Sequence, residues 1–349
     1  MQILLANPRG FCAGVNMALQ SLDVAISRFD GQTIYVYHEI VHNSRVVSHY
    51  ADLGVCFVPS LDDVPECSVL MFSAHGVSPD VRRKAERKSL RIIDATCPLV
   101  SQVHRAVQRY AGLGYHVIYI GHPGHDEVVG TVGEAPGQIT VISSEHDVQT
   151  LVESGLQNHL KLRLACLMQT TLSVTQTRHI VEVLRRHFPN IEIPGVNRSR
   201  LKTPDNVARD SVFPKGKRTC KPEISIGDSI NICYATQNRQ EAVRQLALRS
   251  DMALVVGSAN SSNSRRLREI AEQQGIPALL IDGAEEIDTQ WFSGRETVMI
   301  TAGASAPEYI VEACVARLKS AFDVTTEEVV TCEEHVVFPL PASLSCRVE

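Results

Sequence analysis

The stretch Arg9-Gly-Phe-Cys-Ala-Gly-Val15 joins a predicted strand to a predicted helix. The apolar run at residues 3–6 is typical of a short buried strand. The spacing of apolar residues over 15–29 predicts a helix. Cys12 therefore lies at a helix N-terminus, where free N–H groups and the helix dipole favour a thiolate over a thiol.

The same unit of apolar run, polar loop and amphipathic helix occurs nine times along the chain. Cys12, Cys97 and Cys233 open corresponding units, and the next polar loop follows 30, 28 and 29 residues later, at 42, 125 and 262. Such regular offsets indicate an internal three-fold repeat. Alternating strands and helices predict α/β blocks with largely parallel sheets, whose functional loops gather at the carboxyl ends of the strands. The alternative is one large doubly wound sheet with incidental periodicity.

The repeat divides the chain into three predicted α/β blocks, at residues 1–97, 98–194 and 231–320. Residues 195–230 are rich in Lys and Arg and punctuated by Pro and Gly. They are expected to form a mobile basic insertion, either without a role or as a docking loop for an acidic partner. Residues 321–349 are expected to form a C-terminal strap over the body.

Three cysteines in equivalent places of the repeat are candidate metal ligands. A pseudo-three-fold axis would bring Cys12, Cys97 and Cys233 to one cavity. A strand is predicted at 230–232, directly before Cys233. Three converging thiolates can hold zinc or an iron–sulfur cluster. The chain lacks the C-x₂-C pairs of most structural zinc sites, which favours a cluster with one iron free of protein ligands. Four further cysteines are interpreted as inert small side chains, namely Cys56, Cys67, Cys166 and Cys314.

The remaining polar loops carry groups suited to binding an anion. His42, His75 and His125 can each exchange a proton, and hydroxyl and amide side chains lie at predicted helix starts. Helix N-termini gathered with such donors at one cavity form a strong phosphate site, although each side chain taken singly is more typical of an N-cap. The candidates of this kind are Ser261, Ser262, Asn263 and Ser305.

Glu127 is a candidate proton donor. It lies in the fifth polar loop, and Thr170 or Thr171 of the neighbouring loop can hold its carboxyl group. The alternative is a first-turn helix acid that the dipole stabilises. The chain has no Walker-type phosphate loop, so nucleotide hydrolysis is not indicated.

Composition excludes several classes of partner. The 34 basic and 39 acidic side chains give a net charge of −5, which gives no reason to expect nucleic acid or an anionic membrane. No apolar run is long enough to span a bilayer, and the N-terminus lacks a basic signal region. Ten cysteines in such a chain suggest reduced thiols, so we expect a cytoplasmic protein.

Nine motifs follow one another along the chain. They are Gly-Phe-Cys-Ala-Gly at 10–14, His-Glu-Ile-Val-His-Asn at 38–43, Ser-Ala-His-Gly-Val at 73–77, Asp-Ala-Thr-Cys-Pro-Leu-Val at 94–100, Gly-His-Pro-Gly-His-Asp-Glu at 121–127, Gln-Thr-Thr-Leu-Ser at 169–173, Ile-Cys-Tyr-Ala-Thr at 232–236, Asn-Ser-Ser-Asn-Ser at 260–264 and Thr-Ala-Gly-Ala-Ser-Ala-Pro at 301–307. In this order, and over almost the whole chain, they resemble the LytB family of 4-hydroxy-3-methylbut-2-enyl diphosphate reductases.

The resemblance implies a trefoil of three α/β domains around one 4Fe–4S cluster, held by Cys12, Cys97 and Cys233 with one iron left open. Glu127 would deliver protons. The residues that would bind the substrate, chiefly its diphosphate, are His42, His75, His125, Thr170, Ser261, Ser262, Asn263 and Ser305. Where this family usually has a short connection, the chain has residues 195–230.

The implied reaction is the reductive dehydroxylation of (E)-4-hydroxy-3-methylbut-2-enyl diphosphate. Its products would be isopentenyl and dimethylallyl diphosphates, at the last step of the non-mevalonate isoprenoid route. Because the chain lacks a dinucleotide-binding fingerprint, a ferredoxin or flavodoxin is the expected electron donor. One alternative is a non-redox iron–sulfur hydro-lyase acting on a small anionic substrate. Another is an iron–sulfur sensor or zinc-stabilised binding module without catalysis.

Overall fold

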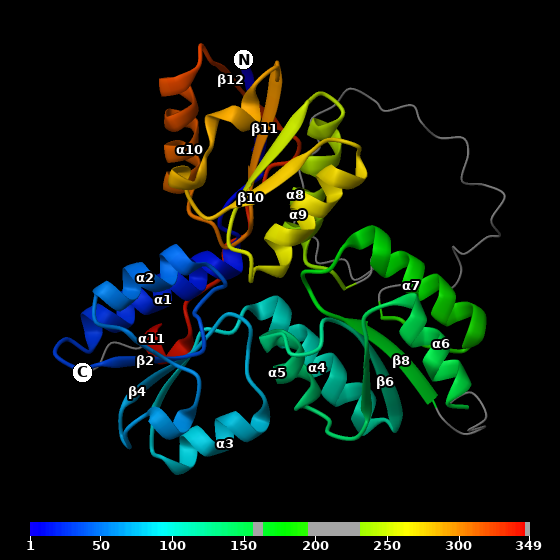
Figure 1. The fold of residues 1–349 in the computed structure, drawn as a ribbon. Coiled ribbons are helices and arrows are strands. Elements are labelled where there is room, and N and C mark those ends of the chain that lie inside the picture. The colour runs from blue at the N-terminus through cyan, green and yellow to red at the C-terminus, as the bar shows by residue number, and fades with distance from the viewer. Residues whose placement is uncertain (156–162, 195–230, 346–349) are drawn as a thin grey trace.

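Parallel strands form three separate sheets in the computed structural model, which describes residues 1–155, 163–194 and 231–345. The β1 sheet has the order β10-β9-β11-β1-β12, the β2 sheet β3-β2-β4-β5 and the β6 sheet β7-β6-β8. The strands are β1 (Gln2–Asn7), β2 (Ile34–Tyr37), β3 (Cys56–Val58), β4 (Val69–Phe72), β5 (Arg91–Asp94), β6 (Tyr115–Ile120), β7 (Ile139–Ile142), β8 (Arg163–Met168), β9 (Met252–Val256), β10 (Ala278–Ile281), β11 (Thr297–Ala302) and β12 (Thr325–Val330). Figure 1 shows one lobe around each sheet and the three lobes meeting at a common centre.

Helices connect the strands and begin at residues suited to that position. Asn43, Ser78, Ser144 and Ser173 each accept a hydrogen bond from a first-turn amide, and Pro79 opens one helix. The helices are α1 (Ala13–Arg28), α2 (Ser44–Asp52), α3 (Pro79–Arg87), α4 (Pro98–Gly112), α5 (Asp126–Val132), α6 (Glu145–Glu153), α7 (Val174–His187), α8 (Tyr234–Ala247), α9 (Ser262–Gln273), α10 (Glu308–Ala321) and α11 (Ala342–Ser345), with 3₁₀ turns at Leu61–Asp63, Ala284–Glu286 and Thr289–Phe292.

Each sheet is covered on both faces, because its inner strands are apolar on both faces. All four residues of β4 are buried; Met71 packs with Leu22 of α1 on one face, and Leu70 packs with Ala85 of α3 on the other. The β1 and β6 sheets likewise have a core on each face. Burying one such side chain contributes roughly 2 kcal/mol, so each sheet is held rigidly and fixes the loops at its carboxyl edge.

The predicted fold class, α/β with several parallel sheets, is confirmed, because every described strand pair is parallel. The extra strands expected near Val55, Ile139 and Ala278 are β3, β7 and β10. The prediction of a strand at 230–232 is wrong for residues 231 and 232, which the structure describes and which form no strand. The polar neighbours of Ile232 leave too short an apolar run to form one.

The sheets cross the predicted block boundaries at both ends of the chain. β1, from the first block, pairs with β11 and β12 instead of β2, and therefore belongs to the sheet of the third block. β12 lies within the predicted strap. A strand pairs with the sheet edge whose apolar faces match its own. The order of strands along the sequence does not determine which edge that is. The block boundaries stay a prediction, and the insertion at 195–230 lies outside the described residues.

The C-terminal segment joins two lobes. After β12, residues 331–341 form no regular strand or helix until α11, whose Leu344 packs into the core between α1 and the β2 sheet. Arg28 of α1 donates a 3.0 Å hydrogen bond to the carbonyl of Ser343. Figure 1 shows α11 beside α1, away from β12. None of the described helices is long and apolar enough to cross a membrane.

Candidate active site

Cys12, Cys97 and Cys233 occupy equivalent backbone positions. They are the N-cap residues of α1, α4 and α8, and in each case the side chain makes no capping hydrogen bond. Each amide N–H donates to the carbonyl of a loop residue that follows a strand of one of the sheets. The bonds are Cys12 to Ala304 at 3.2 Å, Cys97 to Ala74 at 3.0 Å and Cys233 to Thr170 at 3.0 Å. This shared bond fixes three sulfur atoms around one centre and supports the three-fold repeat.

Gly14 lies where two of these cysteines approach each other. A Cβ atom at this position would lie 2.7 Å from Sγ of Cys97 and 3.9 Å from Sγ of Cys12. Only glycine leaves this space open. Gly10, at φ +66°, turns the chain from β1 toward Cys12 in a conformation that other residues adopt only with strain.

One cavity of about 100 Å³ brings together every site residue that the sequence predicts. Its lining includes the three cysteines Cys12, Cys97 and Cys233. The other predicted residues in its lining are His42, His75, His125, Glu127, Thr170, Ser261, Ser262, Asn263 and Ser305. They come from all three lobes, so the cavity exists only where the lobes meet.

The surroundings of the three cysteines suit ligands of a metal cluster better than they suit free thiols. Burial, followed by the nearby Cys12, raises the pKa of the Cys97 thiol far above its usual range and that of Cys233 to about 11. Without a cation these thiols stay protonated, whereas a bound metal would stabilise their thiolates. Three soft sulfur donors around one space form a ligand set suited to iron–sulfur chemistry.

The other described cysteines are free, with the exception of Cys332. Cys56, Cys67, Cys166 and Cys314 are free in the described residues, and Cys166 and Cys314 are buried. Cys332 is disulfide-bonded, so the expectation of reduced thiols does not hold for the whole chain.

Glu127 is a buried carboxyl group with its own hydrogen-bond partners. It is 2% exposed, and its two oxygens accept hydrogen bonds from the Thr170 amide at 2.7 Å and the Thr170 hydroxyl at 2.9 Å. Burial raises the pKa of Glu127 to about 7, although both bonds to Thr170 oppose this shift. A substantial share of Glu127 is therefore protonated at neutral pH, as a proton donor requires. Thr170, and not Thr171, holds the carboxyl group.

The three predicted histidines form a cluster in which two rings are kept neutral. The rings of His42 and His75 stack with centroids 3.9 Å apart, and His125 meets His42 edge-on at 5.0 Å. Burial, and then repulsion from His42, lowers the pKa of His75 well below its usual value and that of His125 to about 4. Nδ1 of His125 accepts the amide hydrogen of Glu127 at 3.2 Å, so His125 also caps α5.

Buried polar atoms without partners indicate that the cavity holds a ligand. Within the described residues, both side-chain polar atoms of Asn263 and Nε2 of His42 are buried and unpaired. Leaving one such group unpaired costs about 1–3 kcal/mol, which a polar ligand would recover. Ser261 also caps α9, through the Ser264 amide at 3.3 Å, so for this residue the N-cap interpretation holds as well. The Ser305 hydroxyl donates to the His42 carbonyl at 2.9 Å.

Sequence analysis missed two residues that shape the site. Arg239 of α8 is 1% exposed, and its Nη2 donates to the Gly10 carbonyl at 2.8 Å. Its Nη1 forms an ion pair with Glu334 of the C-terminal segment at 3.0 Å. Phe338, from the same segment, lines the cavity. No local pattern marks Arg239, but the apolar run at 336–341 could have directed attention to Phe338.

Fold and site together define an α/β protein of three parallel sheets, with three cysteines and a protonatable carboxyl group at the common centre. The sequence model of the family described as LytB protein matches residues 3–319. The chain is 47% identical over 345 residues to the 4-hydroxy-3-methylbut-2-enyl diphosphate reductase of Rhodopirellula baltica, covering 99% of this chain and 96% of the relative. It is 45% identical over 352 residues to the reductase of that name from Chromohalobacter salexigens, covering 100% and 99%.

A solved structure agrees with these relatives. The E-1-hydroxy-2-methyl-but-2-enyl-4-diphosphate reductase of Plasmodium falciparum superposes with a TM-score of 0.83 at 33% identity, covering 99% of this chain and 96% of that one. The chain belongs to the LytB family. The curated relatives have about the same length as this chain.

Proposed function

We propose that this chain is an iron–sulfur oxidoreductase that converts (E)-4-hydroxy-3-methylbut-2-enyl diphosphate into isopentenyl and dimethylallyl diphosphates. One observation carries the proposal: the cavity that holds the three convergent thiols also contains Glu127, whose pKa is raised to about 7. The same cavity contains unpaired donors suited to an anion. A reduction that removes a hydroxyl group from a diphosphate ester needs these three features in one place.

Cys12, Cys97 and Cys233 are the proposed ligands of one 4Fe–4S cluster, with one iron open. Such a cluster supplies electrons and, at the open iron, a Lewis acid for a hydroxyl oxygen. The protein contributes the equivalent N-cap positions, which hold the three sulfur atoms, and Gly14, which leaves room between Cys12 and Cys97.

The loops opposite the cysteines are the proposed diphosphate site. His42, His75 and His125 lie together there, and α9 directs its N-terminus, with Ser261, Ser262 and Asn263, at the same cavity. Free N–H groups and hydroxyl donors at a helix N-terminus bind phosphate oxygens. Ser305 and Thr170 complete the set. Binding energy from the diphosphate then holds the reacting carbon in position.

Glu127 is the proposed proton donor. The net reaction takes up two electrons and two protons, breaks the allylic C–O bond and releases the hydroxyl oxygen as water. Glu127 supplies a proton to the departing oxygen, and Thr170 keeps the carboxyl group oriented while it does so. The burial that raises its pKa also keeps bulk water away from the carboxyl group of Glu127.

The electrons come from a ferredoxin or a flavodoxin in this proposal, and the reaction takes place in the cytoplasm. One-electron carriers of this kind match a cluster that passes single electrons, whereas no dinucleotide fingerprint occurs in the sequence.

Anaerobic purification followed by iron and sulfide analysis tests the proposal, together with a dithionite-driven assay on the hydroxylated allylic diphosphate. We expect four irons per chain and formation of both products only when the reductant is present. Zinc in place of iron would contradict the cluster assignment. Conversion of the substrate without any reductant would favour the hydro-lyase instead.

A further inference from the structure

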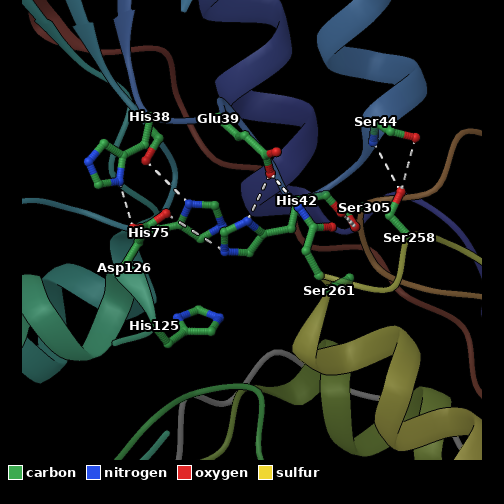
Figure 2. A network of polar contacts seen from close by, with 12 residues as sticks. His38, Glu39, His42, Ser44, His75, His125, Asp126, Ser258, Ser261 and Ser305 are labelled. Carbon is green, nitrogen blue, oxygen red and sulfur yellow. Dashed lines mark hydrogen bonds and ion pairs between the residues drawn. The ribbon is translucent and has the colours of Figure 1, made fainter. Parts of the chain in front are cut away.

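The cavity is closed in two different ways. Around the histidines the lobes close on each other. His38, after β2, pairs with Asp126 of α5 in another lobe, with Nδ1 and Oδ1 2.6 Å apart (Figure 2). Elsewhere the lining includes Phe338, from the segment at residues 331–341 that runs from β12 toward α11. This segment forms no regular strand or helix, so contacts with the rest of the protein must hold it over the cavity.

Phe338 lies on the inner side of the C-terminal segment. Between residues 333 and 340, exposed side chains alternate with half-buried ones, and Glu334 and Phe338 belong to the half-buried set. Val337, the neighbour of Phe338, is 84% exposed. A single layer of chain therefore separates the cavity from solvent here, and the ring of Phe338 is the part of that layer that faces inward.

Arg239 contacts both this segment and the turn that carries Cys12. Its Nε and Nη2 donate to the Gly10 carbonyl at 3.2 and 2.8 Å. Its Nη1 donates to the Ala235 carbonyl at 2.9 Å and to Oε1 of Glu334 at 3.0 Å. Every nitrogen of the guanidinium thus has an acceptor, as a buried cation requires.

Three segments meet at this guanidinium. α8 begins directly after Cys233 and supplies Arg239 from its second turn. Gly10, at φ +66°, lies in the turn that precedes the first cysteine. Glu334 also accepts a 3.0 Å hydrogen bond from Asn238, the neighbour of Arg239 on α8. Moving the C-terminal segment away would leave a buried charge unpaired, which is costly, so the ion pair favours the closed position.

We propose that Arg239 and Glu334 are positioning residues that hold the C-terminal segment over the cavity, so that Phe338 shields the three cysteines and the group they bind. This role rests on the proposed function, which assigns an iron–sulfur cluster to these cysteines. A cluster with an open iron needs such a shield, because oxygen and water reach that iron unless protein covers it. The ion pair acts by keeping the ring in place, so losing both should cost little more than losing one.

Two measurements on the full chain test this role. The first follows the loss of visible absorbance when anaerobically purified, cluster-loaded protein receives a fixed dose of oxygen. The second measures by mass spectrometry how fast iodoacetamide alkylates the three cavity cysteines in metal-free protein, relative to the exposed, free Cys67. The second measurement needs neither a cluster nor turnover, so failure of the proposed function is a separate result.

Glu334→Gln keeps the size of the side chain and removes its charge, whereas Phe338→Ala removes the ring. We expect each variant to raise both rates about tenfold, since losing one charge-assisted or packing contact changes a local opening equilibrium by that factor. The double variant should be close to the faster single variant, because residues that act through each other are not additive. The controls Glu333→Gln and Val337→Ala change the exposed neighbours and should match the wild type.

Three results would overturn the proposed role. Wild-type rates in Phe338→Ala would show that the ring shields nothing. Wild-type rates in Glu334→Gln would show that the ion pair does not hold the segment. A rise of roughly a hundredfold in the double variant, the product of two independent effects, would show that Glu334 does not act through Phe338. If Glu334→Gln fails to fold, Asn238→Ala, which removes the other hydrogen bond to Glu334, must raise both rates instead.

Discussion

The cysteine side of the cavity is symmetric, whereas the side proposed to bind the diphosphate is not. On the cysteine side, each lobe boundary contributes the same residue, at the same N-cap position, with the same backbone hydrogen bond. On the other side, corresponding loops carry different side chains. The loops that follow each cysteine by about 29 residues contribute His42, His125 and Ser262, and the later loops contribute His75, Thr170 and Ser305.

This difference teaches that a repeat can keep its backbone geometry while each lobe supplies different chemistry. A metal cluster bound through three equivalent positions needs three identical ligands. An elongated substrate with a charged end has no three-fold symmetry, so its donors must differ from lobe to lobe. The raised pKa of Glu127 and the lowered pKa values of His75 and His125 arise on this asymmetric side.

The largest effect on iron content and turnover is expected from substitutions on the symmetric, cysteine side of the cavity. Replacing Cys12, Cys97 or Cys233 by Ser removes one thiolate, so each variant should lose iron and fall below detectable turnover. Because the three positions are equivalent, the three losses should be alike. Iron analysis and the visible spectrum of anaerobically purified protein measure this. The exposed, free Cys67 provides the control, and Cys67→Ser should retain its iron. Full iron content in any one of the three variants would refute the symmetry.

The substitution Glu127→Gln changes only the asymmetric side of the cavity and leaves the three cysteines in place. We expect kcat to fall about 10²- to 10⁴-fold while iron content stays unchanged, because a positioned proton donor contributes that much. In the wild type, kcat should fall as pH rises through about 7, where Glu127 loses its proton. Glu145, an exposed first-turn acid of α6, is the matched control. If Glu127→Gln keeps full activity, as Glu145→Gln should, Glu127 is only a helix-start acid.

Gly14→Ala tests how closely the symmetric side is packed. The added methyl group would lie 2.7 Å from Sγ of Cys97, so that sulfur must move. A displacement of this kind should lower turnover about 100-fold and weaken iron retention. Gly112→Ala is the control, since a methyl group there meets no atom within 4 Å. Equal activity of the two variants would show that the space between the cysteines is not critical.

The smallest effect is expected from Asn263→Ala. Its buried amide has no partner among the described residues, so a bound diphosphate is the group that would satisfy it. We expect KM to rise about tenfold with little change in kcat, which corresponds to one lost hydrogen bond. Without substrate, the variant should be at least as stable as the wild type in a thermal melt. A lowered melting temperature with an unchanged KM would mean that the amide serves the fold instead.

Much of the fold followed from local patterns. Apolar runs marked β4, β6, β8, β9 and β11, and the helices after them began near the predicted residues. β12 was missed because its sequence, Thr325-Thr-Glu-Glu-Val-Val330, has two acidic residues in its middle. Glu327 lies beside Arg249 and Gln2 at the sheet edge, and these partners make an acidic strand acceptable there.

The site residues with a distinctive chemical type were predictable, while their supporting residues were not. Cysteines and histidines at repeated offsets can be found by counting along the chain. Arg239 and Glu334 look like ordinary charged side chains of a helix or a loop. Their importance comes from contacts with each other and with Gly10, and these partners lie far apart in sequence.

By itself, the sequence determined the repeat and the parallel α/β class, because periodicity and residue type are local properties, and its resemblance to the LytB family indicated the twelve residues that meet in one cavity. Only the tertiary structure decided that β1 joins the sheet of the third block, that burial brings Glu127 to a pKa of about 7 and that Arg239 pairs with Glu334. Sheet edges, burial and charge proximity depend on which distant segments come together. Hydrophobic packing of the whole chain fixes those neighbours, and no short stretch of sequence contains them.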